Sequence, residues 1–352
     1  MFTRAPLIRE GVRHVPPQSE RRRITSKDVA LAAGVSRTTV SFVLNERADV
    51  AIPDSTRQRV WAAASKLGYA PSPEARALRL GRSDVVLCLL PDWPITGPVG
   101  VLLEALSAEL ALAGLTMLSH QRQAADELGQ VLAALTPTAI VTMCDLAEVE
   151  VELAEQRGIQ VVSFMGRVPK QVDVACFTQA DVGRLQVRAV VADRGHSFIG
   201  YVSPYDRKLD WFSAPRLAGA RQEARQLGAR LIHYRLPARD NGSTGKWLET
   251  ARAKGMTAVC AYNDDVAFSL LMAAFERGLS VPDDLSLIGV DDSAFTTLTR
   301  PTLSSIGFRL GPEAKRLTAV ILGDGQGVHP GSPSDVFDLK VRDSLAMRRP
   351  VG

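Results

Sequence analysis

The chain has 352 residues, of which 46% are hydrophobic and 23% charged, and its formal net charge is +4. This ordinary globular composition excludes disordered and collagen-like chains, and no apolar run reaches the ~18 residues that a membrane-spanning helix needs. The length suits two or three domains, and the first residues lack the apolar stretch of a secretion signal, so we expect a cytoplasmic protein.

Charge is distributed unevenly along the chain. Residues 21–82 hold 12 Lys and Arg against 5 Asp and Glu, a net charge of +7, whereas residues 1–20 carry +1 and the remainder carries −4. A basic block joined to an acidic body suggests that the block binds a polyanion. Charge alone leaves a solvated surface open as the alternative, and the fold of the block decides between the two.

The sequence after residue 23 has the pattern of three short helices, preceded by a flexible basic tail, residues 1–23. Thr25 and Asp28 fit a capping box at the start of the first helix, Gly34 fits its end, and Ser36 fits the cap of the second. The apolar residues expected in the shared core are Val29, Ala32 and Ala33, then Val40, Val43 and Leu44, and then Val60, Ala64 and Leu67 of a third helix from about Ser55. Helices joined through A-G-V-S predict a helix-turn-helix domain, residues 24–71.

The second of these helices would enter the DNA major groove. Its early residues Arg37 and Thr38, with Phe42 one turn later, are predicted to reach base edges, and Arg37 suits bidentate binding of guanine. The polar side chains suited to phosphate oxygens are Thr25, Ser26, Ser36, Thr39, Ser41, Asn45 and Tyr69. Three alternatives stay open: Ser36 only caps its helix, Thr39 only packs, and Phe42 belongs to the core.

A second DNA-binding element is predicted in residues 72–82. This segment has a helical pattern but is too short to be stable alone, since isolated helices under ~12–15 residues are marginal in water. Leu78 stands among three arginines, which suits insertion of the leucine at a minor-groove base step as a hinge helix folds on DNA. A plain basic linker is the alternative.

The run from Ile24 to Val86 resembles the DNA-binding headpiece and hinge of the lactose-repressor/galactose-repressor (LacI/GalR) family. The matching stretches are DVALAAGVSRTTVSFVLN, TRQRVWAAASKLGYAP and EARALRLGRS. The resemblance implies that Arg37 and Thr38 are the variable base readers and that Leu78 is the hinge leucine. Two features depart from the family pattern: Phe42 occupies a position that often carries a base-reading arginine, and the stretch DVAIPDS is longer than usual.

From Ser83 onward, the pattern alternates between strands and helices. The expected strands lie in VVLCLLP, LTMLSH, AIVTMC, IQVVSFMG, HSFIGYVSP, LIHYRL, TAVCAY and LSLIGV, and the expected helices at Leu102–Ala113, Glu148–Arg157, Arg184–Val191 and Arg216–Leu227. Buried strands joined by helical crossovers imply parallel sheets covered on both faces. The doubled pattern predicts two lobes with a cleft between them: an N-lobe of about 83–177 and 307–335, and a C-lobe of about 178–306 and 336–347.

Ligands of open α/β sheets bind beyond the carboxyl ends of the strands. The polar residues expected there are Asp92, Asn263, Asp264, Asp291 and Asp292, with Arg216 opening a nearby helix. An arginine fork with amide and carboxylate acceptors can satisfy a ring of hydroxyls, which favours a sugar or nucleoside-like ligand over a fatty acid. The alternative is that Asn263 and Asp291 only cap helices.

The stretches RLAG, YNDD, LSLIGVDD with RPTLSSI, and LKVRDSLA resemble the periplasmic-binding-protein-like effector domain of the same family. The resemblance implies an effector site at Arg216, Asn263 and Asp291 and a structural role for Asp292. Asp92, Trp93, Trp211 and Phe212 are further candidates in stretches that match the family poorly. The tryptophans suit stacking on a sugar face or burial in the core.

Motifs for catalysis are missing from the sequence. It contains no Walker loop and no G-x-S-x-G, and we expect His196 to bind a backbone carbonyl rather than act as a base. The cysteines Cys88, Cys144, Cys176 and Cys260 stand singly in apolar runs, which indicates neither zinc nor disulfides. Paired aspartates at 264–265 and 291–292 lack a third convergent motif for a metal. We predict no enzyme, cofactor or metal.

The predicted fold is an all-α helix-turn-helix headpiece with a hinge helix, followed by an α/β, periplasmic-binding-protein-like core of two doubly wound parallel-sheet lobes, residues 83–352. The predicted function is repression of transcription by a homodimer that binds a pseudo-palindromic operator and responds to a sugar effector. No heptad repeat marks the C-terminus, which favours a dimer over a tetramer. The alternatives are an effector-independent or protein-controlled regulator with a vestigial cleft, a solute-binding protein, which would need a signal peptide and no headpiece, and an α/β enzyme.

Overall fold

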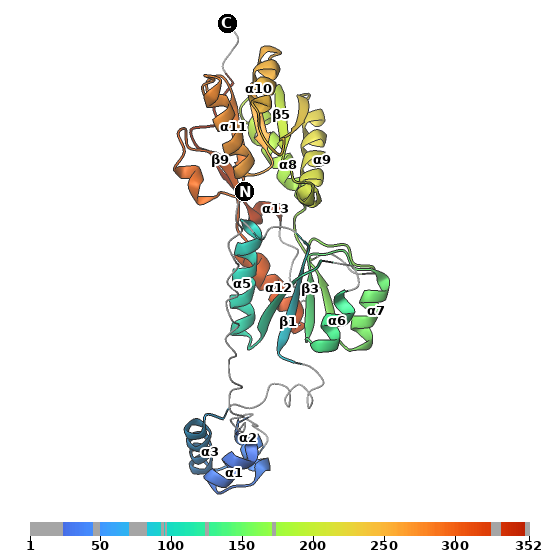
Figure 1. Ribbon diagram of the computed structural model, residues 1–352, viewed down its shortest axis with the longest axis vertical. Helices are drawn as coiled ribbons and strands as arrows, with labels where there is room; N and C mark the ends of the chain where they lie inside the picture. Colours follow the sequence, from blue (N-terminus) through green and yellow to red (C-terminus); the bar gives the residue numbers. More distant parts are fainter. Residues whose placement is uncertain are drawn as a thin grey trace, which may run out of the picture. The chain divides into compact units, whose positions relative to one another are not determined.

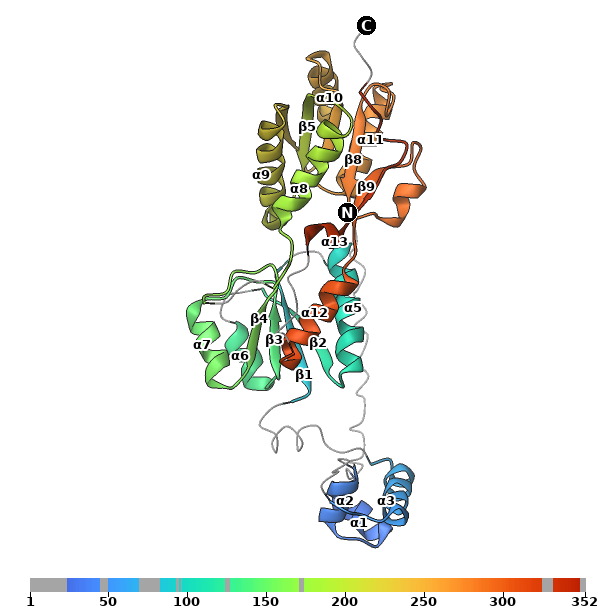
Figure 2. The same ribbon diagram turned by 180° about the vertical axis from the view of Figure 1, so that it is seen from behind.

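The structure is a computed structural model that describes residues 24–44, 50–69, 83–92, 95, 97–123, 127–170, 174–324 and 332–348. It divides into two compact units, residues 1–81 and 82–352, and Figures 1 and 2 show it from opposite sides. The predicted tail (residues 1–23), the predicted hinge helix with Leu78, and the candidates Asn45 and Trp93 lie outside the described residues. Among the described helices, none is both long and apolar enough to cross a membrane.

The first unit contains three helices: α1 (Ser26–Ala33), α2 (Arg37–Leu44) and α3 (Asp54–Leu67). The Asp28 carboxylate accepts hydrogen bonds from Thr25 N at 2.8 Å and Thr25 Oγ1 at 2.7 Å, which fixes the start of α1. Gly34 ends α1 with φ 64°, a left-handed conformation that favours glycine. Ser36 Oγ accepts from Thr39 N at 3.0 Å and caps α2. The helix-turn-helix pattern is confirmed.

A small apolar core joins these three helices. It consists of Val29, Ala30, Ala33, Val40, Val43, Val60, Ala63 and Ala64, with Leu44, Leu67 and Tyr69 packed at its edge. The prediction that Ala32 belongs to this core is wrong, because its side chain is exposed. The buried stripe of α1 runs through Val29, Ala30 and Ala33, which points Ala32 away from α2 and α3.

The N-lobe of the second unit has a four-stranded parallel sheet in the order β2-β1-β3-β4. Its strands are β1 (Val85–Leu90), β2 (Thr116–Gln121), β3 (Ala139–Thr142) and β4 (Gln160–Ser163), and its helices are α5 (Pro98–Leu112), α6 (Glu127–Ala134), α7 (Glu148–Gln156) and α12 (Gly311–Leu322). Val86 and Cys88 pack with residues of α5 and α12, whereas Leu87 and Leu89 pack with residues of α6 and α7. Both faces of the sheet are therefore covered, as predicted.

The C-lobe has a six-stranded sheet in the order β10-β9-β8-β7-β5-β6, in which only the β9–β10 pairing is antiparallel among the described strand pairs. Its strands are β5 (Phe198–Ser203), β6 (Arg230–Arg235), β7 (Ala258–Ala261), β8 (Ser286–Val290), β9 (Ser304–Phe308) and β10 (Phe337–Lys340). Its helices are α8 (Gln179–Val187), α9 (Asp210–Gln226), α10 (Ser243–Ala253), α11 (Asp264–Glu276) and the short α13 (Pro333–Val336), with 3-10 turns at Arg207–Leu209 and Ala294–Thr297 and a π-helical turn at Arg188–Ala192. The chain passes between the lobes after β4, after β9 and again before β10. Two α/β lobes confirm the predicted fold class.

Two helix boundaries in the C-lobe differ from the prediction. The helix expected at Arg184–Val191 begins earlier, at Gln179. Arg216 does not open its helix, because α9 begins at Asp210 and contains Pro215 in its interior. A proline inside a helix removes one backbone hydrogen bond, and the loss is tolerated here because α9 is packed closely against α8.

Glycines set the close approach of α8 and α9. A Cβ atom added at Gly219 would lie 2.0 Å from the carbonyl oxygen of Ala180, and one added at Gly183 would lie 1.9 Å from that of Arg216. The two helix backbones are therefore in direct contact. This contact places Gln179 on α8 next to Arg216 on α9.

Replacing Gly219 with alanine is expected to destabilise the second unit by about 1–3 kcal/mol, because the new methyl group overlaps backbone that cannot move freely. The free energy of unfolding in urea measures the effect. Gly311→Ala at the start of α12 is the matched control, since nothing lies within 4 Å of a Cβ there. Equal stability of the two variants would show that α8 and α9 do not need this close contact.

Candidate ligand cavity and nucleic-acid interface

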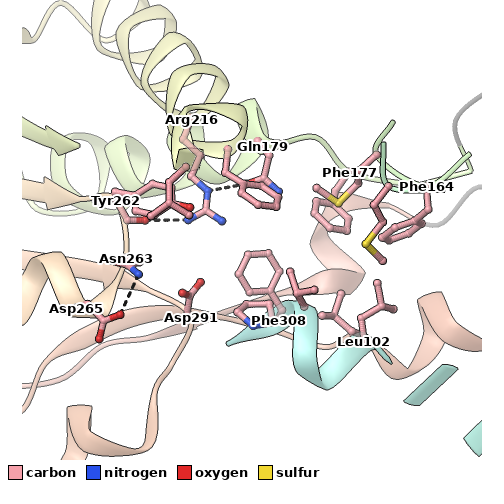
Figure 3. A pocket seen from close by; sticks show the side chains of 17 residues that line it. Leu102, Phe164, Phe177, Gln179, Arg216, Tyr262, Asn263, Asp265, Asp291 and Phe308 are labelled. Carbon is pink, nitrogen blue, oxygen red and sulfur yellow. Dashed lines mark hydrogen bonds between the residues drawn. The ribbon is translucent and has the colours of Figure 1, made fainter. Parts of the chain in front are cut away.

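A cavity of about 230 Å³ lies at the carboxyl ends of strands from both lobes. The lining residues that directly follow these strands are Met143 after β3, Phe164 and Met165 after β4, Tyr262 and Asn263 after β7, and Asp291 after β8. The other lining residues are Pro98, Val99, Leu102, Phe177, Gln179, Leu209, Phe212, Arg216, Asp265, Phe308 and Leu310. Figure 3 shows the cavity from close by. Its position is where open α/β sheets bind small molecules.

Arg216 lies in the wall of this cavity and is 5% exposed. Its Nε donates to Gln179 Oε1 at 2.6 Å and its Nη1 donates to the carbonyl oxygen of Tyr262 at 2.8 Å, as Figure 3 shows. The Tyr262 ring faces the guanidinium, with its centroid 4.7 Å from Cζ. These contacts hold the guanidinium in one orientation, which prepares it to recognise a ligand.

Asp291 is the second charged group of the cavity. Its Oδ1 atom is closed off from solvent and has no hydrogen-bond partner among the described residues. Burial raises the pKa of the Asp291 carboxyl to about 7, although the nearby Arg216 and a hydrogen bond with the Asn263 side chain act in the opposite direction. The N-lobe backbone approaches this carboxylate closely, because a Cβ at Gly97 would lie 3.2 Å from Asp291 Oδ2. A buried acceptor without a donor is unfavourable, and a ligand hydroxyl or amine would relieve that cost.

Asn263 both caps a helix and lines the cavity. Its Oδ1 accepts from Val266 N at 3.0 Å at the start of α11, and its Nδ2 donates to Asp265 Oδ2 at 3.4 Å. The capping alternative therefore applies to Asn263. It does not apply to Asp291, because Ser293 is the residue that precedes the next helical turn.

Asp264 and Asp292 belong to the frame that supports the cavity. Asp264 accepts from Ser305 Oγ and from Ser293 N, each at 2.7 Å, and burial raises the pKa of its carboxyl to about 6. Asp292 Oδ1 accepts from the Arg342 guanidinium at 2.5 Å. Together these bonds hold the loop after β8 and so position Asp291.

Two other candidates from the sequence lie outside the cavity. Asp92 forms an ion pair with Lys208, with Oδ2 and Nζ 2.7 Å apart. This pair joins the N-lobe loop after β1 to the C-lobe turn at Arg207–Leu209. Trp211 lines a neighbouring depression with Pro215, whereas the adjacent Phe212 lines the cavity itself. Neither Asp92 nor Trp211 therefore lines the cavity in which an effector was predicted to bind.

Sequence reasoning missed most of the cavity wall. Met143, Phe164 and Met165 also directly follow strands, but they are apolar, and only polar residues were expected at these positions. The strand ends themselves were the available signal. Phe177 lies between β4 and α8, Gln179 is the first residue of α8 and Phe308 is the last residue of β9. Their place in the cavity depends on how the two lobes meet.

The buried histidine His196 has structural partners. His196 Nε2 donates to the carbonyl oxygen of Ala346 at 3.0 Å, and burial lowers the pKa of its imidazole. This is the backbone hydrogen bond expected from the sequence. Within the part of the chain that the structure describes, no group of three or more His, Cys, Asp and Glu side chains could hold a metal ion.

In the first unit, the start of α2 presents the side chains predicted to contact DNA. Arg37 and Thr38 are exposed, Ser41 and Phe42 are half-buried, and the opposite face of α2 packs into the core through Val40 and Val43. Among the predicted phosphate contacts, Thr25 and Ser36 are exposed, and Ser26, Thr39 and Tyr69 are half-buried. Ser36 and Thr39 share the capping hydrogen bonds of α2, so their side chains have a structural role as well. The geometry leaves Arg37 and Thr38 exposed and outside the core.

A helix-turn-helix unit followed by a two-lobed α/β body with a cavity at its strand ends defines a ligand-responsive, DNA-binding regulator of transcription. Residues 25–72 match the model of the bacterial regulatory proteins of the lacI family, and residues 189–344 match the periplasmic binding protein-like domain. The chain belongs to the LacI/GalR family of transcriptional regulators, as its resemblance in sequence predicted.

Similar proteins span nearly the whole chain. The transcriptional regulator GalS of Salmonella typhimurium is 28% identical over 93% of this chain and 98% of its own. The transcriptional repressor CytR of Escherichia coli is 28% identical over 90% of this chain and 94% of its own. In fold, the chain is similar to the lac repressor dimer bound to operator and the anti-inducer ONPF, with a TM-score of 0.73, 21% identity, and coverage of 92% of this chain and 100% of that one. GalS and CytR are regulators of transcription by name, which confirms the predicted class of function, a DNA-binding transcriptional regulator.

Proposed function

We propose that this protein is a transcriptional repressor that binds a pseudo-palindromic operator as a homodimer and is controlled by a sugar-type effector in the cavity between its lobes. The observation that carries effector control is the Asp291 Oδ1 atom, which is buried without a hydrogen-bond donor among the described residues. A neutral or fully paired group at this position would make the core more stable. Binding of an effector therefore explains the unpaired carboxylate oxygen better than a structural role does. The protein acts on chromosomal DNA in the cytoplasm and catalyses no reaction.

DNA recognition is assigned to the start of α2 and to the hinge segment. Arg37 and Thr38 read base edges in the major groove, and Phe42 offers an apolar contact in place of the arginine common in the family. The hinge segment, residues 72–82, folds on DNA and inserts Leu78 into the minor groove, which bends the operator. The polar residues named above bind phosphates and fix the register.

The dimer interface is assigned to the exposed face of α11. Phe268, Met272 and Phe275 follow one another at helical spacing and remain 41%, 38% and 78% exposed. The Phe295 ring lies edge-on to Phe268 at 5.8 Å, and Leu298 beside it is 77% exposed. We call these five residues the α11 patch. An exposed apolar patch of this kind marks a protein interface, and the similar lac repressor is a dimer on its operator.

Control of DNA binding follows from the position of the cavity. A ligand that contacts both lobes changes the relative stability of their arrangements, and so changes the spacing of the two hinges in a dimer. A coupling free energy on the order of 1–3 kcal/mol is expected, and it acts equally in both directions.

Selection of duplexes from random DNA tests the proposed function. The full chain should enrich a two-fold symmetric sequence and bind it about a thousandfold more tightly than random duplex at moderate salt. Equal affinity for selected and random duplexes would refute sequence-specific regulation.

Arg37→Ala tests the assignment of the base reader. The variant should lose preference at one base pair in each half-site, with a penalty of about 1–3 kcal/mol, while its affinity for random duplex changes little. Arg59→Ala in α3, also exposed, is the matched control and should leave the preference profile unchanged. An Arg37→Ala profile identical to that of the wild type would remove Arg37 from this role.

A further inference from the structure

The polarity of the cavity is divided between its two ends. The lining residues from the N-lobe are all apolar: Pro98, Val99, Leu102, Met143, Phe164 and Met165. The polar side chains of the lining all come from the C-lobe: Gln179, Arg216, Tyr262, Asn263, Asp265 and Asp291. Figure 3 shows this separation, with Arg216 and Asp291 near one end and Leu102 and Phe164 near the other.

The apolar end contains a cluster of aromatic rings. Phe177 packs edge-on against Phe164 at 6.4 Å and lies 6.0 Å from Phe308. Phe164 and Phe177 are 1% and 5% exposed, so their positions are fixed by packing and their surfaces toward the cavity form a firm wall. A hydroxylated ring placed here would lose its bonds to water and gain none from these side chains, which is unfavourable.

The polar end offers both hydrogen-bond acceptors and donors. Asp291 and Asp265 contribute two carboxylates, and the guanidinium of Arg216 donates through Nε to Gln179 and through Nη1 to the Tyr262 carbonyl oxygen, which leaves its Nη2 atom for a ligand. Asn263 uses its oxygen to cap α11. This end therefore suits hydroxyl or amine donors, and its carboxylates disfavour an acidic group.

We propose that the effector is an amphiphile with two parts: a hydroxylated, sugar-like head bound at Arg216 and Asp291, and an apolar, ring-sized group bound against Leu102 and the Phe164–Phe177–Phe308 cluster. This inference rests on the proposed effector control and narrows its ligand to the chemistry shared by aryl glycosides and nucleosides. A free monosaccharide fills only the polar end and leaves the apolar end in contact with water.

Calorimetry on the full chain with matched ligand pairs tests this proposal. The probes are glucose, galactose, xylose and ribose, each paired with its phenyl glycoside, together with the ribonucleosides and the fragment 2-phenylethanol. For the sugar configuration that is accepted, the aromatic member should bind about tenfold or more tightly than the free sugar, because burial of a phenyl-sized group contributes roughly 1.5–3 kcal/mol. The nucleosides and phenyl glycosides distinguish the two sources of the apolar group. The fragment alone should bind with a Kd on the order of millimolar.

Val99→Thr tests the location of the apolar end with almost no change in shape. It should weaken binding of the aromatic ligand about 3- to 10-fold and leave free-sugar binding unchanged, because it places a hydroxyl against the apolar group. Val101→Thr on the same helix, where the side chain is 51% exposed, is the matched control and should change neither.

Two results would overturn the proposal. One is a free sugar that binds within about threefold of its phenyl glycoside, which would show that the apolar end adds no affinity. The other is the failure of every aromatic probe, including 2-phenylethanol, to bind at concentrations of about ten times the expected millimolar Kd. Either result leaves the operator selection untouched, so failure of this inference is distinguishable from failure of the proposed function.

Discussion

Asp291→Asn should abolish the effector response while raising the stability of the core. The substitution replaces a carboxylate acceptor with an isosteric amide, so a ligand hydroxyl loses a charge-assisted hydrogen bond and the effector binds about 10- to 100-fold more weakly. In the absence of effector, the same change removes an ionised group whose pKa burial raises to about 7. Because this pKa lies so far above its ordinary value of 3.8, ionising the carboxyl at pH 8 costs the folded wild type on the order of 4 kcal/mol, and the variant should be more stable by up to that amount, with a higher Tm.

The pH dependence of that stabilisation identifies its cause. Between pH 4 and pH 7, folded Asp291 keeps a proton that the unfolded chain has lost, so the stability of the wild type falls as the pH rises through this window. The advantage of the asparagine variant should therefore be absent near pH 4 and complete above about pH 7. Differential scanning calorimetry at a series of pH values measures it.

Asp338→Asn provides the control for this result. The Lys340 ammonium beside Asp338 lowers the pKa of its carboxyl, the opposite direction from Asp291, and the residue lies outside the cavity. This variant should gain no stability at pH 8 and should bind effector like the wild type. If Asp291→Asn bound effector normally, or if it were less stable than the wild type at pH 8, the account of the cavity would be wrong.

Phe275→Glu should convert the dimer into monomers and thereby weaken operator binding about 100-fold or more. The α11 patch would have to bury the new carboxylate against an apolar partner surface, which is strongly unfavourable. A monomer loses the gain in affinity that comes from linking two headpieces on adjacent half-sites. Sedimentation equilibrium measures the first effect, and titration of a selected operator measures the second.

Val149→Glu is the matched control for the α11 patch. Val149 lies on α7 and is 69% exposed, so the substitution introduces the same charge at a similarly exposed apolar position of the other lobe. It should remain dimeric with unchanged operator affinity. A dimer that survived Phe275→Glu with full operator affinity would rule out the α11 patch as the interface.

The fold could be predicted from the sequence because the patterns that indicate its helices and strands are local. The capping box at Thr25 and Asp28, the turn at Gly34 and the buried runs of β1 and β8 each depend on neighbouring residues alone. One of the misplaced helix starts, Arg216, stands after Pro215, which resembles a helix start in sequence. Its true position in the interior of α9 depends on contact between α8 and α9, which is a property of the folded lobe.

Only part of the cavity lining could be predicted from the sequence, for a related reason. Asn263, Asp291 and Arg216 are polar residues near strand ends or in a helix that a family pattern identifies, and all three line the cavity. Asp92 has the same sequence signature but pairs with Lys208 from the other lobe. Phe177 and Phe308 have no local signature, because their segments reach the cavity only where the chain passes between the lobes. Contacts between lobes are long-range, and residue spacing does not encode them.

The most direct test of the account is the affinity of the full chain for the tightest ligand of the glycoside and nucleoside panel, measured by calorimetry with and without a selected operator duplex. If occupancy of the cavity controls DNA binding, the ligand affinity should change by roughly 5- to 150-fold when operator is bound, and the operator affinity should change by the same factor when ligand is bound. A ligand that fills the cavity with the same affinity in the free and the operator-bound protein would contradict the account.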